Sequence, residues 1–198
     1  DNLHVSYYDS VNSSLKYATS MNGSWVNFTI DNSGGDIGVN SSIIIDESDN
    51  IHISYRAGYS SPELRYATYD GVSWSITTVD NSGAVGDSSS IDIDSSGNIH
   101  ISYLDVGNSA LKYAVSNGTS WDISTIDGPG NVGYSTSLAL GINNEVSISY
   151  HDEANKSLNY AYFDGDSWGL SIIDGPNSVG RDSALKIDSS GEAHISYY

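Results

Sequence analysis

The chain has 198 residues, and its 25 acidic and 7 basic side chains give a formal net charge of −18. This length suits one ordinary domain with a hydrophobic core, and no apolar run is long enough for a transmembrane helix. The negative charge repels nucleic acids and anionic lipids, so neither is expected as a partner. Because the sequence has no cysteine, it has no disulfide, thiol nucleophile or thiolate metal site.

An internal repeat organises the whole sequence. The segment His4-Val5-Ser6-Tyr7 returns along the chain at intervals of 47 or 48 residues. Its copies begin at His4, His52, His100, Ser147 and His194. A Leu-x-Tyr-Ala segment, a Ser-Trp pair and a stretch from Asp to Gly recur between them in constant order. We therefore expect modules of about 47–49 residues at approximately 1–40, 41–88, 89–135 and 136–182, with 183–198 supplying terminal strands.

Each module predicts four short strands. In the module 89–135 they cover 90–94, 99–103, 111–114 and 121–127, and turns rich in Gly, Asn, Ser and Asp separate them. No apolar stripe of helical period persists for three turns, so the chain is predicted to be all-β. Four strands in about 45 residues are typical of a propeller blade. We predict a single domain over 1–198, a four-module β-propeller of four-stranded antiparallel blades; another all-β repeat array is the alternative.

The order of strands within a blade also follows from this fold. The innermost strands are expected to begin at Ser42, Ser90, Ser137 and Ala184. The strand that contains tryptophan is then outermost, and the stretch from Asp to Gly carries the chain to the next blade.

The two ends of the chain carry one copy of the His-x-Ser-Tyr strand too many for a simple closed ring of four blades. The chain is then a piece of a longer array, or the surplus strand lies on an edge, or it pairs with a second copy of the protein. Head-to-tail pairing of this kind produces rings or filaments, so self-association is expected. The assembly strands would contain His4, Val5, Ser6 and Tyr7 at one end and His194, Ile195, Ser196 and Tyr197 at the other.

Recurring histidines and turn aspartates are the candidate metal ligands. The histidines lie on different modules and diverge, so we expect them to satisfy polar groups between blades rather than to bind one ion. Aspartates gather in the predicted turns, where carboxylate oxygens suit calcium. They are Asp46, Asp49, Asp94, Asp164, Asp166 and Asp188. Calcium is the one cofactor that this pattern suggests; in the alternative, each Asp bonds only the N–H groups of its own turn.

No catalytic constellation emerges from the sequence. His151 and Asp152 follow the fourth copy of the repeated strand, but no motif of an activated nucleophile accompanies them. We therefore expect a protein that is not an enzyme, and a hydrolase is the third hypothesis after the two given below.

Aromatic residues and sequons suggest contact with sugars. The four tryptophans, Trp25, Trp74, Trp121 and Trp168, are candidates for stacking on a ligand. In the alternative they pack between blades, together with Ile76, Ile123 and Leu170 on the same strand faces. The candidate glycosylation sites are Asn12, Asn22, Asn27, Asn40, Asn117 and Asn155.

The motifs Asp94-Ser95-Ser96-Gly97-Asn98, His100-Ile101-Ser102-Tyr103, Leu111-Lys112-Tyr113-Ala114 and Ser-Trp resemble the repeats of secreted bacterial and archaeal β-propellers. These proteins are distantly similar to sialidase-like repeats and propeller lectins. The resemblance implies an extracellular or cell-surface location and a role in binding or scaffolding. We expect a structural or adhesive propeller that assembles through its terminal strands; the alternative is a lectin that binds glycans between blades or on loops.

Overall fold

A computed structural model of the protein describes residues 2–21 and 23–198. Every regular element in these residues is a β-strand, as the repeat predicts. None of them forms a helix that is long and apolar enough to cross a membrane. The chain divides into two compact units, one up to Asp87 and one from Ser88, and the boundary falls within a strand.

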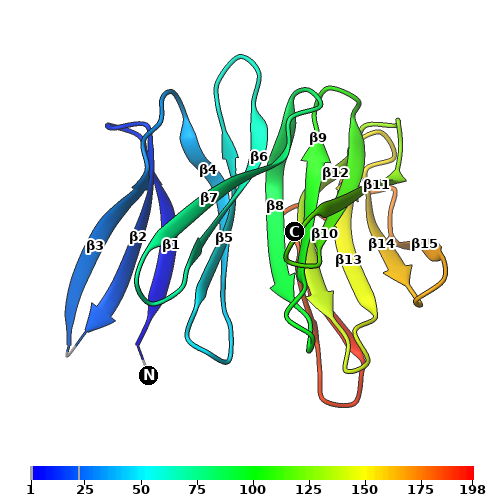
Figure 1. Ribbon diagram of the computed structural model, residues 1–198. Helices are drawn as coiled ribbons and strands as arrows, with labels where there is room; N and C mark the ends of the chain where they lie inside the picture. The colour runs from blue at the N-terminus through cyan, green and yellow to red at the C-terminus, as the bar shows by residue number, and fades with distance from the viewer. Residues whose placement is uncertain (1, 22) are drawn as a thin grey trace. The chain divides into compact units, whose positions relative to one another are not determined.

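The first unit contains two antiparallel sheets (Figure 1). One sheet has the order β1-β2-β3 and consists of β1 (His4–Asp9), β2 (Ser14–Met21) and β3 (Ser24–Asp31). The other has the order β4-β5-β6-β7 and consists of β4 (Ile37–Ile45), β5 (Ile51–Ala57), β6 (Glu63–Tyr69) and β7 (Trp74–Asp80). The sheets pack face to face, with β4 against β1 and β2.

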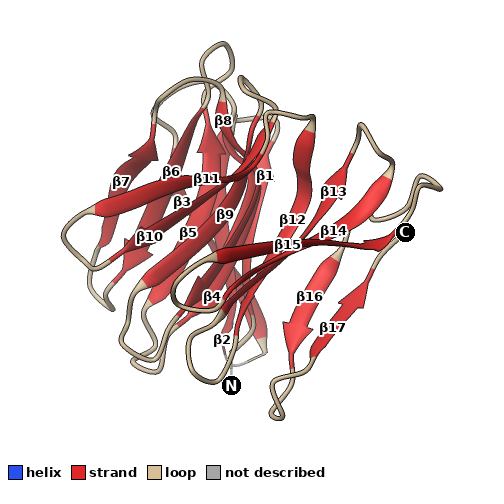
Figure 2. Ribbon diagram, turned by 90° about the vertical axis from the view of Figure 1, so that its right-hand side faces the viewer, coloured by secondary structure: helices blue, strands red, loops and turns tan. Residues whose placement is uncertain are grey.

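The second unit repeats this arrangement (Figure 2). One sheet contains β8 (Val85–Ile93), β9 (Ile99–Asp105), β10 (Ala110–Ser116) and β11 (Trp121–Asp127). The next contains β12 (Val132–Leu140), β13 (Val146–Asp152), β14 (Ser157–Phe163) and β15 (Trp168–Asp174). A two-stranded sheet of β16 (Ala184–Ile187) and β17 (Ala193–Ser196) packs against β12 and β13.

Three of the predicted innermost strands start earlier than the sequence predicts, because β8 begins at Val85 rather than Ser90 and β12 at Val132 rather than Ser137, as β4 also does; β16 begins at Ala184, as predicted. β4 begins at Ile37 rather than at Ser42, because a bulge keeps this segment paired with β5. Gly38 and Asn40 adopt positive φ values of 100° and 51° there. A Cβ on Gly38 would lie only 2.6 Å from the Cα of Leu15, so this close approach between blades requires glycine.

A hydrogen bond between Tyr and Asp recurs where one blade meets the next. The Tyr of the His-x-Ser-Tyr strand donates to the Asp that ends the last strand of the preceding blade. In the first unit, the Tyr55 hydroxyl donates to Asp31 at 2.8 Å, and both residues are buried. In the second unit, Tyr150 donates to Asp127 at 2.6 Å and Tyr197 donates to Asp174 at 2.9 Å. Tyrosine therefore links blades as well as filling the core.

The same aspartate shapes the turn that follows it. Asp31 also accepts the backbone N–H of Ser33 at 3.0 Å and the guanidinium of Arg65 at 2.8 Å. Burial alone would raise the pKa of Asp31, but the hydrogen bonds from Ser33, Tyr55 and Arg65 lower it. Burial, and then the charge of Asp31, raises the pKa of Tyr55, so its hydroxyl stays protonated and donates.

The predicted assembly strands both pair within the chain. His4, Val5, Ser6 and Tyr7 lie on β1, which pairs with β2. His194, Ile195 and Ser196 lie on β17, where they pair with residues of β16, and Tyr197 follows the strand. Pairing with a second copy of the protein stays a prediction.

Removal of the Tyr55 hydroxyl tests the bond between blades. We expect Tyr55→Phe to lower the free energy of unfolding by about 2 kcal/mol, because the buried Asp31 carboxylate loses a charged hydrogen bond. Tyr197→Phe is the matched control, and its exposed bond should cost less than about 1 kcal/mol. Urea unfolding measures both values. Equal losses in the two variants would contradict the prediction.

Candidate functional site

The repeated histidines form hydrogen bonds within their own blades rather than between blades. His52 Nδ1 lies 2.6 Å from the Tyr66 hydroxyl, and its Nε2 lies 3.4 Å from Asp46. His100 makes the same pair of contacts with Tyr113 and Asp94. Ser147 replaces histidine in the fourth copy and contacts Tyr160 at 2.8 Å. The expectation that these histidines serve polar groups of a neighbouring blade is therefore wrong.

The resulting Asp–His–Tyr chain has the order of a catalytic triad but not its chemistry. Burial lowers the pKa of His52, and Asp46 opposes only part of that shift. Burial also raises the pKa of Tyr66, which makes its hydroxyl a poorer nucleophile. The same chain recurs in two blades.

The turn aspartates mostly accept hydrogen bonds from their own turns. Asp46 accepts the N–H groups of Ser48 and Asn50, and Asp94, Asp164 and Asp188 act in the same way. This arrangement agrees with the simpler alternative to calcium at these positions, whereas calcium itself stays a prediction.

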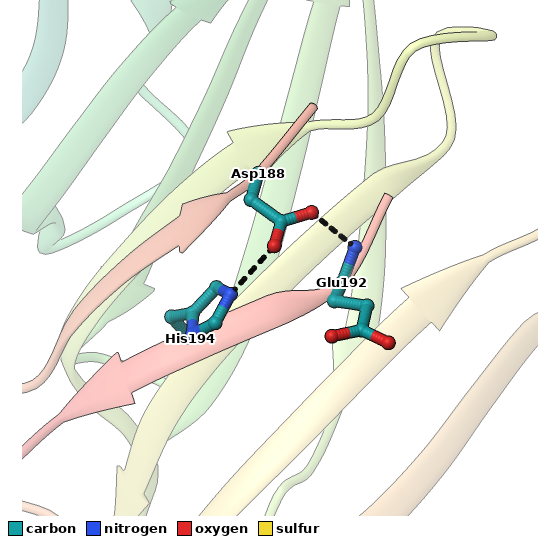
Figure 3. Close-up of side chains that lie close together, drawn as sticks. All are labelled: Asp188, Glu192 and His194. Atoms are coloured by element: carbon teal, nitrogen blue, oxygen red, sulfur yellow. Dashed lines mark hydrogen bonds and ion pairs between the residues drawn. The ribbon is translucent and has the colours of Figure 1, made fainter. Parts of the chain in front are cut away.

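One group of metal-ligating side chains lies among the described residues. Figure 3 shows Asp188, Glu192 and His194 at the turn between β16 and β17, with ligand atoms within 4.8 Å of one another. His194 Nε2 lies 2.9 Å from Asp188, which also accepts the backbone N–H of Glu192 at 3.0 Å. Glu192 takes the position of Asn50 in the β4–β5 turn and Asn98 in the β8–β9 turn, and all three side chains of the group are exposed.

Two tryptophans pack between blades. Trp74 meets Tyr17 edge-on with ring centroids 5.7 Å apart, and Trp168 meets Tyr113 at 5.3 Å. Packing between blades is therefore confirmed for these two, whereas the expectation that Ile76, Ile123 and Leu170 pack there is wrong, because each is 40–49% exposed. Trp25 is more than half exposed and Trp121 is partly buried. A stacking role for any of the four stays a prediction.

Most of the predicted glycosylation sites lie on the surface. Asn12, Asn27, Asn40, Asn117 and Asn155 are exposed, and Asn22 lies outside the described residues. The amides of Asn12 and Asn155 donate to Asp9 and Asp152 within their turns. Glycosylation stays a prediction.

A concave site lies in the second unit, between the blade β12–β15 and the hairpin β16–β17. The cleft has a volume of about 460 Å³, which falls in the usual range of small-molecule sites. Its lining residues are Tyr134, Ser135, His151, Glu153, Arg181 and Asp182. They come from the start of β12, the end of β13 with its following turn, and the connection that leads to β16.

Backbone contacts fix the connection that forms one side of this cleft. Gly180 donates its N–H to the carbonyl of Tyr198 at 2.8 Å, and Tyr198 donates to the carbonyl of Arg181 at 3.0 Å. A Cβ on Gly180 would lie 2.6 Å from the Cα of Leu158, so glycine lets the connection approach β14. The backbone that carries Arg181 is thereby fixed on the hairpin.

Glu153 stands at the centre of a charged network in the cleft. Its carboxylate accepts hydrogen bonds from Lys156, from His151 Nε2 at 3.0 Å and from Arg181 Nη2 at 2.8 Å. His151 is almost fully buried, and its Nδ1 donates to the carbonyl of Val179 at 2.8 Å. Both ring nitrogens therefore face acceptor oxygens.

The electrostatics of this network favour the ionised form of the Glu153 carboxylate. Hydrogen bonds from Lys156 and then His151 lower the pKa of Glu153 to about 2, with a further contribution from the charge of Arg181 and against partial desolvation. Arg181 and Lys156 are each about half exposed, so both keep donor groups that face solvent. The cleft thus offers charged donors and an acceptor side by side.

Sequence reasoning noticed His151 but missed this site. Glu153 replaces Ser10, Gly58 and Val106 of the other modules, and Arg181 replaces Val39, Asp87 and Tyr134. The network thus joins Glu153 and Arg181, which are 28 positions apart in the sequence and both differ from the residues at the same position of the other modules. A search for positions where one module breaks the pattern of the others would have found it.

Comparisons of the whole chain place it among β-propellers. The SapL1 lectin in complex with alpha methyl fucoside is similar with a TM-score of 0.70 and 18% identity, over 100% of this chain and 69% of that protein. A mutant of the Aleuria aurantia lectin in complex with Fucalpha1-6GlcNAc gives a TM-score of 0.67 and 15% identity, over 99% and 70% of the two chains. The Penicillium chrysogenum alpha-L-arabinanase gives 0.69 and 10%, over 98% and 71%.

These likenesses confirm the predicted fold, an all-β propeller of four-stranded antiparallel blades. The intramolecular trans-sialidase from Ruminococcus gnavus is also similar, with a TM-score of 0.61 and 16% identity over 93% of this chain and 45% of that enzyme. The sequence matches no protein-family model, and no curated protein matches it.

The ionisation of Glu153 tests the charged network. We expect its carboxyl to titrate at about pH 2 in an NMR experiment, and Lys156→Ala to move this midpoint upward because the largest favourable contact is lost. Arg181→Ala should move it less. A midpoint near the ordinary glutamate value of about 4.3 in the unmodified protein would contradict the geometry.

The buried histidines make stability depend on pH. Because burial lowers the pKa of His52 and His100, the folded state prefers their neutral rings, and this stability is lost as the pH falls below about 6.5, where the unfolded chain takes up protons. We expect the free energy of unfolding to fall between pH 7 and about 5. The double variant His52→Ser, His100→Ser, which copies the serine of the fourth repeat at Ser147, should flatten this slope. An unchanged slope would show that other groups cause it.

Proposed function

We propose that the protein is a carbohydrate-binding β-propeller and that the cleft around Glu153 and Arg181 binds a sugar residue. The observation that carries this proposal is the network of Glu153 with His151, Lys156 and Arg181 in a concave site. The lectins named above, which were solved with fucose-containing ligands, share the fold and support a binding role.

The chemistry of the cleft suits the hydroxyl groups of a sugar. A hydroxyl both donates and accepts, and neighbouring hydroxyls can therefore bridge the Arg181 guanidinium and a carboxylate of Glu153 or Asp182. Tyr134 adds an apolar ring to the wall. Because three donors already hold the Glu153 carboxylate in place, a ligand that enters the cleft does not have to order this side chain.

Binding fits the cleft better than acid catalysis. A glycosidase needs one carboxylic acid that is protonated near neutral pH and donates to the leaving group. Glu153, with a pKa of about 2, is ionised there and serves as an acceptor. Some proteins of similar fold are enzymes, so the test below includes a search for cleaved products.

The test is binding of methyl α-L-fucoside, methyl β-D-galactoside and methyl α-D-mannoside, followed by calorimetry and by NMR of the backbone amides. We expect at least one sugar to shift the amides of Glu153 and Arg181. Arg181→Ala and Glu153→Gln should each weaken its binding by about tenfold or more, because each removes a charged hydrogen bond. The sugar should be recovered intact.

Matched controls lie on the neighbouring hairpin. Lys186→Ala and Glu192→Gln remove exposed charges that do not line the cleft, and we expect binding to be unchanged. Binding that survives both cleft variants would place the sugar elsewhere. Absence of any binding, or cleavage of the sugar, would overturn the proposal.

An extracellular or cell-surface location would suit a glycan-binding protein, since its ligands are found there. Adhesion and self-association through the terminal strands are compatible with such a role. All three stay predictions.

A further inference from the structure

The blade β1–β3 has an exposed apolar face. Leu3 and Val5 occupy the positions that Ile51 and Ile53 hold in the blade β4–β7. Ile51 and Ile53 are 4% and 0% exposed, because they share a hydrophobic cluster with residues of the preceding blade such as Leu15. Leu3 and Val5, in contrast, are 63% and 43% exposed. No blade precedes β1–β3 among the described residues, so this face is open.

Trp25 extends the same face. Trp74 packs edge-on against Tyr17 of the preceding blade, with ring centroids 5.7 Å apart. Trp168 packs against Tyr113 of its preceding blade in the same way, at 5.3 Å. Trp25 holds the equivalent position on β3, but more than half of its surface is exposed. The first blade therefore presents the surface with which later blades pack on their predecessors.

The blade β12–β15 carries the matching surface. Tyr160 holds the position of Tyr17 and Tyr113, which are buried beneath tryptophans of the following blade. Tyr160 itself is partly exposed, and Tyr162 beside it is 38% exposed. The hairpin β16–β17 packs against β12 and β13, but no strand with a tryptophan follows it among the described residues (Figure 2). The outer part of this blade face therefore has no cover there.

Polar contacts between blades show which groups would meet across such a junction. Asp31 accepts hydrogen bonds from the Tyr55 hydroxyl and the Arg65 guanidinium, which both belong to the following blade. In the first blade, Tyr7 takes the place of Tyr55 and Lys16 that of Arg65. The open face thus combines apolar side chains with a hydroxyl and a cation that suit an aspartate at the end of another blade.

That aspartate is present at the other end of the repeat and is only weakly covered. Asp174 ends β15 as Asp31 ends β3, and it accepts a hydrogen bond from Tyr197. β17, which precedes Tyr197, has four residues and begins with Ala193, and both of these side chains are exposed. Ala193 stands where the first blade has Leu3, so β1 would bury more apolar surface than β17 in this place.

We propose that the first blade of a second copy of the protein takes the place of β17. The inner strand β16 of one copy and the strands β1–β3 of its partner then form one four-stranded blade. In the three four-stranded blades, the His-x-Ser-Tyr strand lies between the inner strand and the Leu-x-Tyr-Ala strand. β1 and β17 are both strands of this kind, so they compete for one position rather than pair with each other.

The contacts of this composite blade copy those within each unit. The partner's Trp25 covers Tyr160, and the partner's Tyr7 and the partner's Lys16 bind Asp174. Because opposite ends of the chain meet, the contact is heterologous and produces rings or filaments. This inference does not depend on sugar binding and goes beyond the function proposed above.

The test is sedimentation velocity over a range of protein concentrations. Salt is kept at about 0.15 M, because the net charge of −18 opposes association and is screened there. We expect the mass to rise with concentration and Trp25→Ala to weaken association by about tenfold or more, since an interface tryptophan is removed. Tyr59→Ala is the matched control, because it removes an exposed aromatic side chain that is not on this face. Its association should be unchanged.

A second pair of variants tests the direction of the contact and the exchange of strands. Tyr160→Ala should also weaken association, and an equimolar mixture with Trp25→Ala should form dimers, because each variant keeps the surface that the other has lost. A chain that ends at Glu192 lacks β17 and should associate at lower concentration. Circular dichroism confirms that each variant is folded.

Three results would overturn the proposal. The first is a protein that stays monomeric at all concentrations, as when the ends of one chain close on each other. The second is association that survives Trp25→Ala, which would place the contact elsewhere. The third is loss of association in the chain that ends at Glu192, since β17 would then form the contact itself. None of these results bears on the cleft around Glu153.

Discussion

The hydrogen bond from a core tyrosine to the aspartate of the preceding blade is the constraint on which the rest of each unit depends. Asp31 accepts from Tyr55 and from the backbone N–H of Ser33, so one carboxylate both fixes the next blade and starts the connecting turn. The connection then passes close to β2 at Gly38 and enters β4 through a bulge. In the second unit, the bond between Tyr197 and Asp174 accompanies the connection that brings Arg181 to Glu153. The inter-blade cleft is thus a consequence of how the blades are joined.

The repeats made most of the fold predictable from the sequence. They did not predict the cleft, because its residues Glu153 and Arg181 differ from the repeated pattern. The alternation in segments such as 99–103 fixes strands and their buried faces, because an antiparallel sheet has a side-chain period of two. The start of β4 could not be read from alternation, because Gly38 and Asn40 hold a bulge that breaks the period. The contact between Glu153 and Arg181 depends on a loop that follows no periodic rule. The sequence does show that both residues differ from those at the equivalent positions of the other modules.

The Asp–His–Tyr chains show why the order of residues does not by itself indicate catalysis. In the chain of Asp94, His100 and Tyr113, burial lowers the pKa of the histidine and raises that of the tyrosine. A tyrosine that acts as a nucleophile beside a general base near neutral pH needs a lowered pKa, whereas the pKa of Tyr113 is raised. Ser147 in the fourth copy keeps the bond to its tyrosine without any imidazole. The feature that these copies share is therefore a hydrogen-bonded tyrosine hydroxyl, whose partner is histidine in the first three copies and serine in the fourth.

The cleft around Glu153 meets the cost of its partly buried polar groups from within the protein. The charges there satisfy one another, so a ligand competes with existing partners and gains mainly from a preformed arrangement. Hydrogen bonds from Lys156 and His151 lower the pKa of Glu153 to about 2, so the carboxylate keeps its charge down to low pH. Because the arrangement is held by charges that are partly exposed, its strength should decrease as salt is added.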